Sequence, residues 1–154
     1  METIIRDAGD LDLDRMLPLL DELHGGSDAT IRKPTTGELD AWRQIRADPL
    51  HHVLLAQGDT DVPVGSLDLL IVNNLTRGGR PFGLIENVIV RAAARRQGVG
   101  RQLMEASVSR AREAGCYKVQ FLSNRGRTSA HAFYEAIGFE QLAAGFRMYL
   151  DESS

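Results

Sequence analysis

The sequence predicts a single mixed α/β domain in which helices cover a central sheet. Its 154 residues are enough for one sizeable core and few for two. Segments of helical periodicity alternate along the chain with extended apolar runs, and no internal repeat or linker separates them. Hydrophobic residues make up 43% of the chain and charged residues 25%, as is usual for globular proteins. We therefore expect residues 1–154 to fold as one domain.

The first third of the chain predicts one strand and two helices. Residues 3–8, TIIRDA, form a short run typical of a strand. Apolar residues at helical spacing predict a helix within residues 10–26, and two glycines end it. A second helix is expected over residues 35–48, capped by one of the two threonines with which this segment begins.

The rest of the chain predicts strands first and then two pairs of a helix and a strand. Aliphatic and β-branched runs, separated by turn-forming residues, predict strands at 52–57, 63–72 and 82–90. The elements expected after them are a helix at 98–114, a strand at 117–122, a helix at 129–137 and closing strands at 139–142 and 146–150.

Charge and composition exclude several classes of function. The chain carries 18 Lys and Arg residues against 21 Asp and Glu residues, which argues against binding nucleic acid through its phosphate backbone. The first ten residues lack the basic flank and apolar stretch of a signal peptide, and no apolar run is long enough to span a membrane. The single cysteine, Cys116, permits no intramolecular disulfide. We therefore expect a cytoplasmic protein without nucleic-acid or membrane partners.

The segment RAAARRQGVGRQLM, residues 91–104, has the composition of an anion site. Gly98 and Gly100 stand at the start of a predicted helix, where they allow close approach of a ligand to free backbone N–H groups and the positive end of the helix dipole. Arg95, Arg96 and Arg101 flank this turn, and guanidinium groups suit the oxygens of a diphosphate. A solvated basic turn with no ligand is the alternative.

Glu86 is the first catalytic candidate because it stands inside the predicted strand GLIENVIV. Alternation places Leu84, Glu86, Val88 and Val90 on one face, and Ile85, Asn87 and Ile89 on the other. A strand that is apolar on both faces is usually central, so we expect Glu86 to be partly buried, with a pKa raised by desolvation toward the range of a general base. A structural glutamate at a bulge or in an ion pair is the alternative.

Tyr134 is the second catalytic candidate. It lies in SNRGRTSAHAFYEAIGFE, residues 123–140, one position from the stripe that Ala130, Phe133 and Ile137 should bury. Its ring can therefore be half-buried while its hydroxyl reaches the edge of a cleft. Considered alone, such a tyrosine more often serves packing than proton transfer.

Two motifs together resemble one protein family. RRQGVG is similar to the pyrophosphate-binding Arg/Gln-x-x-Gly-x-Gly/Ala signature of the GNAT superfamily of N-acetyltransferases, with Arg95, Gly98 and Gly100 in the signature places. NRGRTSAHAFYEAIGF resembles the closing segment of the same superfamily. The resemblance implies the GNAT fold, an α+β architecture whose mixed and mostly antiparallel sheet has about six or seven strands flanked by about four helices.

The resemblance also implies a reaction and its residues. The cosubstrate is acetyl-CoA, a primary amine attacks its thioester directly, and no metal is involved. Tyr134 would donate a proton to the departing thiolate, and Glu86 would accept the proton of the amine directly or through water. The implied cofactor contacts are the backbone of Val88, Ile89 and Val90, the turn made of Arg95, Arg96, Gln97, Gly98, Val99, Gly100 and Arg101, and Asn124.

The resemblance implies a small primary amine as the acceptor, and the motifs leave the identity of this amine open. IENVIV, AGCYKV and FYEAIGF resemble glucosamine-phosphate N-acetyltransferases, whereas SNRGRTSAHAFY is similar to aminoalkylphosphonate and aminoglycoside acetyltransferases. Arg32 and Lys33 lie in the loop that lines the acceptor site in this superfamily; they either hold a phosphate or are solvated charges. Related enzymes commonly dimerise, so a homodimer is consistent with the resemblance.

Three alternatives to this function stay open. The domain could bind acetyl-CoA without turnover, as a sensor or interaction module, or it could acetylate a protein amine. A nucleic-acid-binding module is a more distant alternative that depends on the arginine cluster alone.

Four other residues stand out and receive structural interpretations. His51 and His52 are adjacent in an extended segment, so their side chains should point to opposite faces and share no metal ion. Cys116 is interpreted as a small core residue and not as an acyl carrier. Trp42 is expected to pack in the core.

Overall fold

The computed structural model describes residues 2–26, 28–123 and 128–151. It divides into two compact units, Met1–Phe121 and Leu122–Ser154. Each unit is described by itself below. The single domain expected from the sequence stays a prediction.

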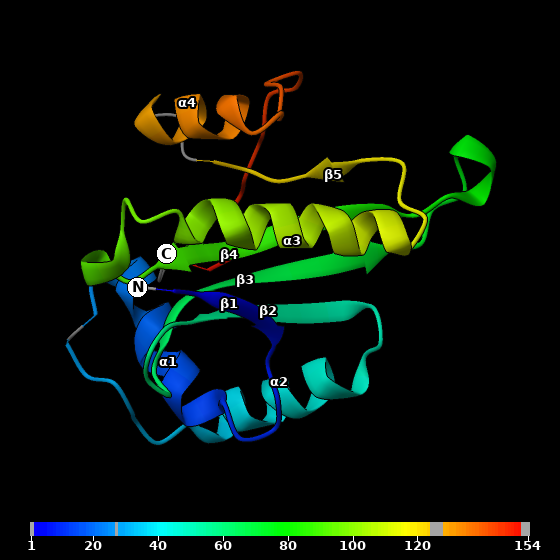
Figure 1. The fold of residues 1–154 in the computed structure, drawn as a ribbon. Coiled ribbons are helices and arrows are strands. Elements are labelled where there is room, and N and C mark those ends of the chain that lie inside the picture. The colour runs from blue at the N-terminus through cyan, green and yellow to red at the C-terminus, as the bar shows by residue number, and fades with distance from the viewer. Residues whose placement is uncertain (1, 27, 124–127, 152–154) are drawn as a thin grey trace. The chain divides into compact units, whose positions relative to one another are not determined.

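The first unit is built on a five-stranded sheet (Figure 1). Its strands are β1 Ile4–Asp7, β2 His51–Gln57, β3 Pro63–Val72, β4 Phe82–Val90 and β5 Val119–Gln120, in spatial order β1-β2-β3-β4-β5. The first four strands pair antiparallel, and β5 runs parallel to β4. The short runs of aliphatic and β-branched residues therefore form strands where the sequence predicts them, except that β5 is much shorter than expected.

Helices cover both faces of this sheet. Helices α1 Leu13–Asp21 and α2 Thr36–Ala47 lie on one face, and α3 Val99–Glu113 lies on the other (Figure 1). Helix α2 begins with a capping box, in which the Thr35 hydroxyl accepts a hydrogen bond from the Glu38 N–H while the Glu38 carboxylate accepts one from the Thr35 N–H. Three short 3₁₀ turns complete the unit: η1 Glu22–His24, η2 Arg77–Gly79 and η3 Ala92–Ala94.

The core of this unit has a layer on each face of the sheet. Under α1 and α2, the buried residues are Ala8, Leu13, Met16, Leu17, Trp42, Val53 and Leu55, so Trp42 packs in the core as predicted. Under α3, Gly65 lets the helix approach β3 closely, because a Cβ at this position would lie 3.0 Å from side-chain atoms of Val99 and Leu103. Burial of these apolar faces holds helices and sheet together.

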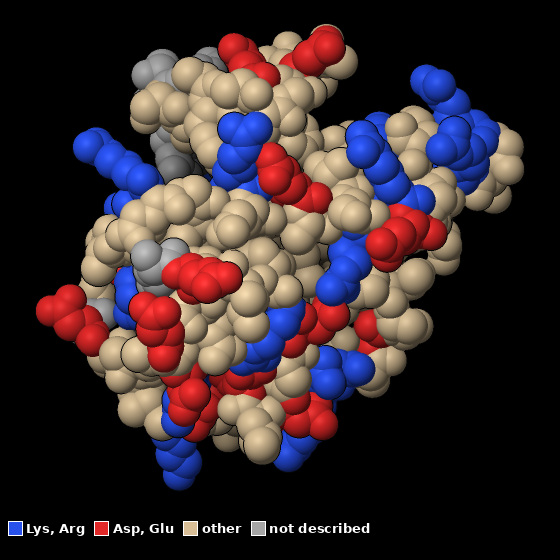
Figure 2. Space-filling model, in the orientation of Figure 1, with Lys and Arg blue, Asp and Glu red and all other residues tan. Residues whose placement is uncertain are grey.

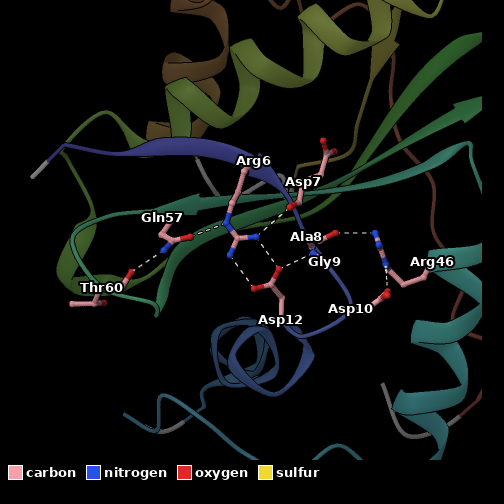
Figure 3. A network of polar contacts seen from close by, with 9 residues as sticks. All are labelled: Arg6, Asp7, Ala8, Gly9, Asp10, Asp12, Arg46, Gln57 and Thr60. Atoms are coloured by element: carbon pink, nitrogen blue, oxygen red, sulfur yellow. Dashed lines mark hydrogen bonds and ion pairs between the residues drawn. The ribbon is translucent and has the colours of Figure 1, made fainter.

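Arginines brace the turn that connects β1 to α1 (Figure 3). Arg6 donates from both terminal nitrogens to the Asp12 carboxylate, at 2.8 and 2.9 Å. From α2, Arg46 donates to the Ala8 carbonyl and to Asp10, both at 2.8 Å. This turn is thus tied to its own strand and to a residue of α2 that lies 36 to 38 positions further along the chain.

The second unit contains α4 Thr128–Ala136, which matches the predicted helix. The closing strands predicted at 139–142 and 146–150 are wrong, because the structure assigns no strand to residues 139–150. Their apolar side chains are exposed, with Phe146 at 92%, Met148 at 82% and Leu150 at 94%. Alternating apolar residues favour an extended chain, but a strand forms only against a partner strand, and these residues pair with none in the described chain. The described sheet therefore has five strands and not six or seven.

Candidate functional site

A β-bulge in β4 interrupts the alternation that the sequence predicts. Ser66 of β3 pairs with Ile89 and Asp68 pairs with Glu86, so one residue of β3 lies opposite two residues of β4. Asn87, inside this step, has the left-handed φ of 54°. Because cross-strand partners share a face, Ile89 lies on the face of Ser66, whereas Ile85, its neighbour before the bulge, lies under α3. The predicted placement of Ile85, Asn87 and Ile89 on one face is therefore wrong.

The bulge leads into an unpaired stretch of strand edge. The parallel pairing with β5 comprises Gly83 with Val119 and Leu84 with Gln120, and no later residue of β4 is paired with β5 in the described chain. Backbone groups on the edge of Val88–Val90 are therefore in position to bond an extended ligand that continues the sheet. Ile89 itself is buried, so only its backbone can serve such a ligand.

The turn after β4 positions the start of α3. Arg96 has the left-handed φ of 64°, and Gly98, the N-cap residue, has a φ of 83°. Glycine has no side chain with which to cap the helix, and the first turn of α3 contains no acidic residue. The N–H groups of this turn are therefore the positive, open end of a 15-residue helix, which is a ready anion site.

Several side chains of this turn already have partners within the protein. Arg95 donates through Nε to the Val90 carbonyl at 3.1 Å, and Arg101 bonds Glu105 one helical turn later at 2.8 Å. Val99 is buried against the sheet, so its side chain serves the core. The arginines flank the turn as expected, but the charge of Arg101 is shared with a carboxylate.

An ion pair that the sequence did not indicate anchors the beginning of this turn. Arg91 lies 3.6 Å from Glu22 of η1, and the two side chains are only 15% and 17% exposed. The Arg91 N–H also donates to the Val64 carbonyl at 2.8 Å. The segment that precedes the glycine turn is thereby held to the end of α1 and to the start of β3.

The two catalytic candidates lie in different units. Glu86 is exposed on β4, so the partial burial expected for it is wrong. Its solvation follows from its place beside the bulge, next to the unpaired edge of the sheet. Tyr134 is half-buried in α4, with its ring centroid 5.4 Å from that of Phe133, as its place beside the helix stripe predicts. Phe133, however, is 36% exposed and not buried. Asn124, a predicted cofactor contact, lies outside the described residues.

Comparison with known proteins identifies the family. A model of the acetyltransferase (GNAT) family matches residues 14–139. The chain belongs to the GNAT acetyltransferase family.

Individual relatives of this GNAT protein differ in the substrates that they are named for. Glucosamine 6-phosphate N-acetyltransferase of Trypanosoma brucei brucei is 41% identical over 76 residues, which cover 49% of this chain and 50% of that protein. The chain thus spans about half the length of that relative. Aminoglycoside N(6')-acetyltransferase type 1 of Stenotrophomonas maltophilia is 29% identical over 147 residues, which cover 81% of this chain and 96% of that protein. A solved structure from Agrobacterium tumefaciens has a TM-score of 0.85 at 36% identity, covering 95% of this chain and 99% of that one.

This GNAT protein also contains a carboxylate that the sequence analysis missed. Asp68 of β3 is only 14% exposed, and its Oδ2 lies 3.1 Å from Nε2 of His51 on β2. Burial raises the pKa of Asp68, and the hydrogen bond and the charge of His51 oppose this rise. An aspartate inside the largely apolar strand PVGSLDLLIV was a signal that could have identified it.

Arg32, one of the two cations considered for the acceptor site, is committed to other groups. It bonds Asp21 of α1 and Glu38 of α2, each at 2.7 Å. The pKa of Glu38 is lowered from 4.5 to about 2, chiefly by the hydrogen bonds that Arg32 donates to its carboxylate. Arg32 therefore ties α1 to α2 through two partly solvated ion pairs. Lys33 beside it is exposed.

The remaining residues considered in the sequence have the following places. His51 and His52 pair with successive residues of β3 and so point to opposite faces, as predicted. Cys116 is half-buried, and burial raises the pKa of its thiol, which disfavours the reactive thiolate. In the part of the chain that the structure describes, no helix is long and apolar enough to cross a membrane.

Charged side chains of both signs are interspersed on much of the face shown in Figure 2. Basic side chains gather on the lobe that carries η2, where Arg77 lies 5.1 Å from the ring centre of Tyr117 and Lys118 lies 5.3 Å from it. These cations are thus engaged with an aromatic ring, and the ring is flanked and not free to stack on a nucleic-acid base. The basic lobe gives no support to a nucleic-acid-binding function.

Proposed function

We propose that this protein is an acetyl-CoA-dependent N-acetyltransferase that moves the acetyl group from the thioester to a primary amine of a small molecule by direct attack. The observation that carries the proposal is the succession, within 15 residues, of a bulged strand with an unpaired edge, a left-handed glycine turn and an uncapped helix start. An extended pantetheine arm needs the first of these features, and a diphosphate needs the other two.

The diphosphate of the cosubstrate would bind the first turn of α3. Backbone N–H groups of Val99, Gly100 and Arg101 would supply donors, and Gly98 leaves the approach open, since nothing lies within 4 Å of the place where its Cβ would be. The exposed side chains of Arg96 and Gln97 would add contacts from the same turn. The pantetheine arm would bond the backbone of Val88, Ile89 and Val90.

In the reaction, the amine nitrogen attacks the thioester carbonyl carbon, a C–N bond forms and a tetrahedral oxyanion results. Glu86 accepts the proton that the nitrogen releases, directly or through water. Its exposure suits this role, because a carboxylate that faces solvent can pass the proton on to water. The C–S bond then breaks, and Tyr134 donates a proton to the departing thiolate.

The relatives suggest a class of acceptor amines and not one compound. The related proteins named above suggest an amino sugar phosphate or an aminoglycoside as the substrate. Because Arg32 is engaged by two carboxylates, a phosphate on the acceptor would have to rely on other cations, such as exposed Lys33. We therefore include amino sugars with and without phosphate among the compounds to be tested.

The experiment is release of free thiol from acetyl-CoA in the presence of glucosamine, glucosamine 6-phosphate, aminoalkylphosphonates, aminoglycosides and polyamines. Turnover with one class names the acceptor. Tyr134→Phe should lower kcat at least tenfold with that acceptor, and Tyr117→Phe, a tyrosine of the η2 lobe, serves as the matched control. Tight binding of acetyl-CoA without thiol release for any amine would contradict the proposal and favour a sensor.

A further inference from the structure

Two residues of the glycine turn, Arg96 and Gly98, have left-handed backbones. Their φ angles are 64° and 83°. Glycine adopts this conformation freely, but arginine keeps it only where surrounding contacts hold it. The shape of the turn that would receive the diphosphate therefore depends on what holds the residues before it.

The 3₁₀ turn η3 connects Arg91 to the residues before Gly98. The Ala94 N–H donates to the Arg91 carbonyl at 2.8 Å and closes η3. The Gln97 side chain donates through Nε2 to the Ala93 carbonyl of η3 at 3.3 Å. Hydrogen bonds thus connect Arg91 through η3 to Gln97, the residue that stands between the two left-handed ones.

Arg91 is in turn held to two other elements. Its N–H donates to the Val64 carbonyl of β3 at 2.8 Å. Its Nη1 lies 3.6 Å from Oε2 of Glu22 in η1, and the Arg91 and Glu22 side chains are only 15% and 17% exposed. Opposite charges attract more strongly at such a place than they do in water. Val64 therefore fixes the backbone of Arg91, and Glu22 fixes its side chain.

The ion pair depends on charge and not on a hydrogen bond. The distance of 3.6 Å between Nη1 and Oε2 is longer than a hydrogen bond. Within the described residues, Oε2 of Glu22 and Nη2 of Arg91 are buried and have no hydrogen-bond partner. A neutral side chain of the same shape at position 22 would thus leave the Arg91 charge buried without a counter-charge, which is costly.

We propose that Glu22 and Arg91 are positioning residues for the cosubstrate, because their ion pair fixes η3 and thereby holds the glycine turn in the conformation that binds the diphosphate of acetyl-CoA. Neither side chain contacts acetyl-CoA in this role, and the effect passes through the backbone of η3. The role rests on the proposed function, since that function places the diphosphate at this turn.

The test is the affinity of the intact protein for acetyl-CoA, measured by calorimetry in Glu22→Gln. Removal of a negative charge favours binding of an anion, so an effect of charge alone would tighten binding. Loss of the ion pair should instead weaken binding at least fivefold, while kcat at saturating acetyl-CoA stays within threefold of wild type. Unchanged or tighter binding would overturn the proposal.

Asp12→Asn is the matched control for Glu22→Gln. Asp12 is 17% exposed, as Glu22 is, and it forms an ion pair with Arg6 at the other end of α1. Its replacement should destabilise the fold but leave the affinity for acetyl-CoA within twofold of wild type. Equal weakening of binding in the two variants would show general destabilisation and would contradict the positioning role.

A double-mutant cycle with Arg91→Met tests whether the two side chains act together. Methionine keeps an unbranched apolar stem and lacks the charge of arginine. Arg91→Met should weaken binding of acetyl-CoA at least fivefold, and Glu22→Gln added to it should weaken binding no further. Losses that multiply in the double variant would mean that the residues act independently, and the proposal would fail.

Amide hydrogen exchange without any ligand separates this proposal from the proposed function. Glu22→Gln should speed exchange of the Ala94 N–H, which closes η3, at least tenfold relative to the amides of β1 and β2, whereas Asp12→Asn should not. If the wild-type protein binds no acetyl-CoA, the proposed function fails, and exchange still decides whether the ion pair holds η3. Uniform acceleration across the first unit, or unchanged exchange at Ala94, would overturn the positioning role.

Discussion

Asp68 on β3 and Glu86 on β4 are Cα partners across the sheet, yet Asp68 is only 14% exposed while Glu86 is exposed. Two ionised carboxylates directly opposite one another repel. The bulge beside Glu86 and the hydrogen bond between His51 and Asp68 let both remain in this arrangement. One carboxylate of the pair thus faces solvent, and the other is bound within the protein.

Replacement of Glu86 tests its role as proton acceptor. Glu86→Gln should lower kcat about a hundredfold to ten-thousandfold, the range expected for loss of a general base, without changing the affinity for acetyl-CoA. Steady-state kinetics with the acceptor found in the thiol assay, and calorimetric binding of acetyl-CoA, measure the two quantities. Glu113→Gln, an exposed glutamate at the end of α3, is the control. A loss of less than threefold in kcat would exclude Glu86 as the base.

Replacement of Gly98 tests the anion site at the start of α3. A Cβ at Gly98 would contact nothing within 4 Å, but its φ of 83° is unfavourable for alanine by about 1–2 kcal/mol. Gly98→Ala should therefore weaken binding of acetyl-CoA at least fivefold and lower the free energy of unfolding by about 1 kcal/mol. Gly37→Ala is a matched control, because Gly37 lies in the first turn of α2 with equal space and no left-handed backbone. Unchanged cofactor affinity in Gly98→Ala would contradict this site.

The raised pKa of Asp68 predicts how its contribution to stability changes with pH. Because the folded pKa lies above the ordinary 3.8, the folded protein holds its proton at higher pH than the unfolded chain does. The contribution of Asp68 to the free energy of unfolding therefore falls as pH rises from about 3.8 through the folded pKa. Asp68→Asn, which has no charge to bury, should gain stability relative to wild type over this window. Thermal unfolding of both proteins from pH 4 to 7 measures it, and a gain that shrinks as pH rises would show that the folded pKa is lowered instead.

The ion pairs of Arg32 predict the opposite dependence of the free energy of unfolding on pH. Glu38 has a folded pKa of about 2 against an ordinary 4.5, so its stabilising contribution is complete above about 4.5 and is lost as pH falls toward 2. Arg32→Gln should lower the free energy of unfolding by about 1 kcal/mol or less at neutral pH, since the pair is partly solvated, and this difference should vanish near pH 2. Arg43→Gln removes an exposed pair on the same helix and controls for charge. A difference between wild type and Arg32→Gln that is constant from pH 2 to 7 would mean that Arg32 stabilises the protein by packing alone.

Local sequence signals predicted most of the first unit. The strands β1 to β4 and the helices α1 to α3 lie within a few residues of their predicted places, because hydrophobic periodicity, glycine ends and the Thr35 cap act over one or two turns. The glycine turn before α3 was identified for the same reason, since it depends on residues 95 to 100 alone. The prediction failed for the closing strands at 139–142 and 146–150. Apolar and polar residues alternate there, but no strand pairs with these residues in the described chain.

The sequence by itself determined the family, the order of elements in the first unit and the position of the glycine turn before α3. Only the tertiary structure decided that Glu86 is exposed to solvent. It also decided that Asp68 interacts with His51, which lies 17 positions earlier in the chain, and that Arg32 forms ion pairs with two carboxylates. Burial, register and ion pairing depend on which side chains the sheet brings together from distant segments. A bulge of one residue reverses the face of every residue after it, and local periodicity contains no record of the cross-strand pairing that places the bulge.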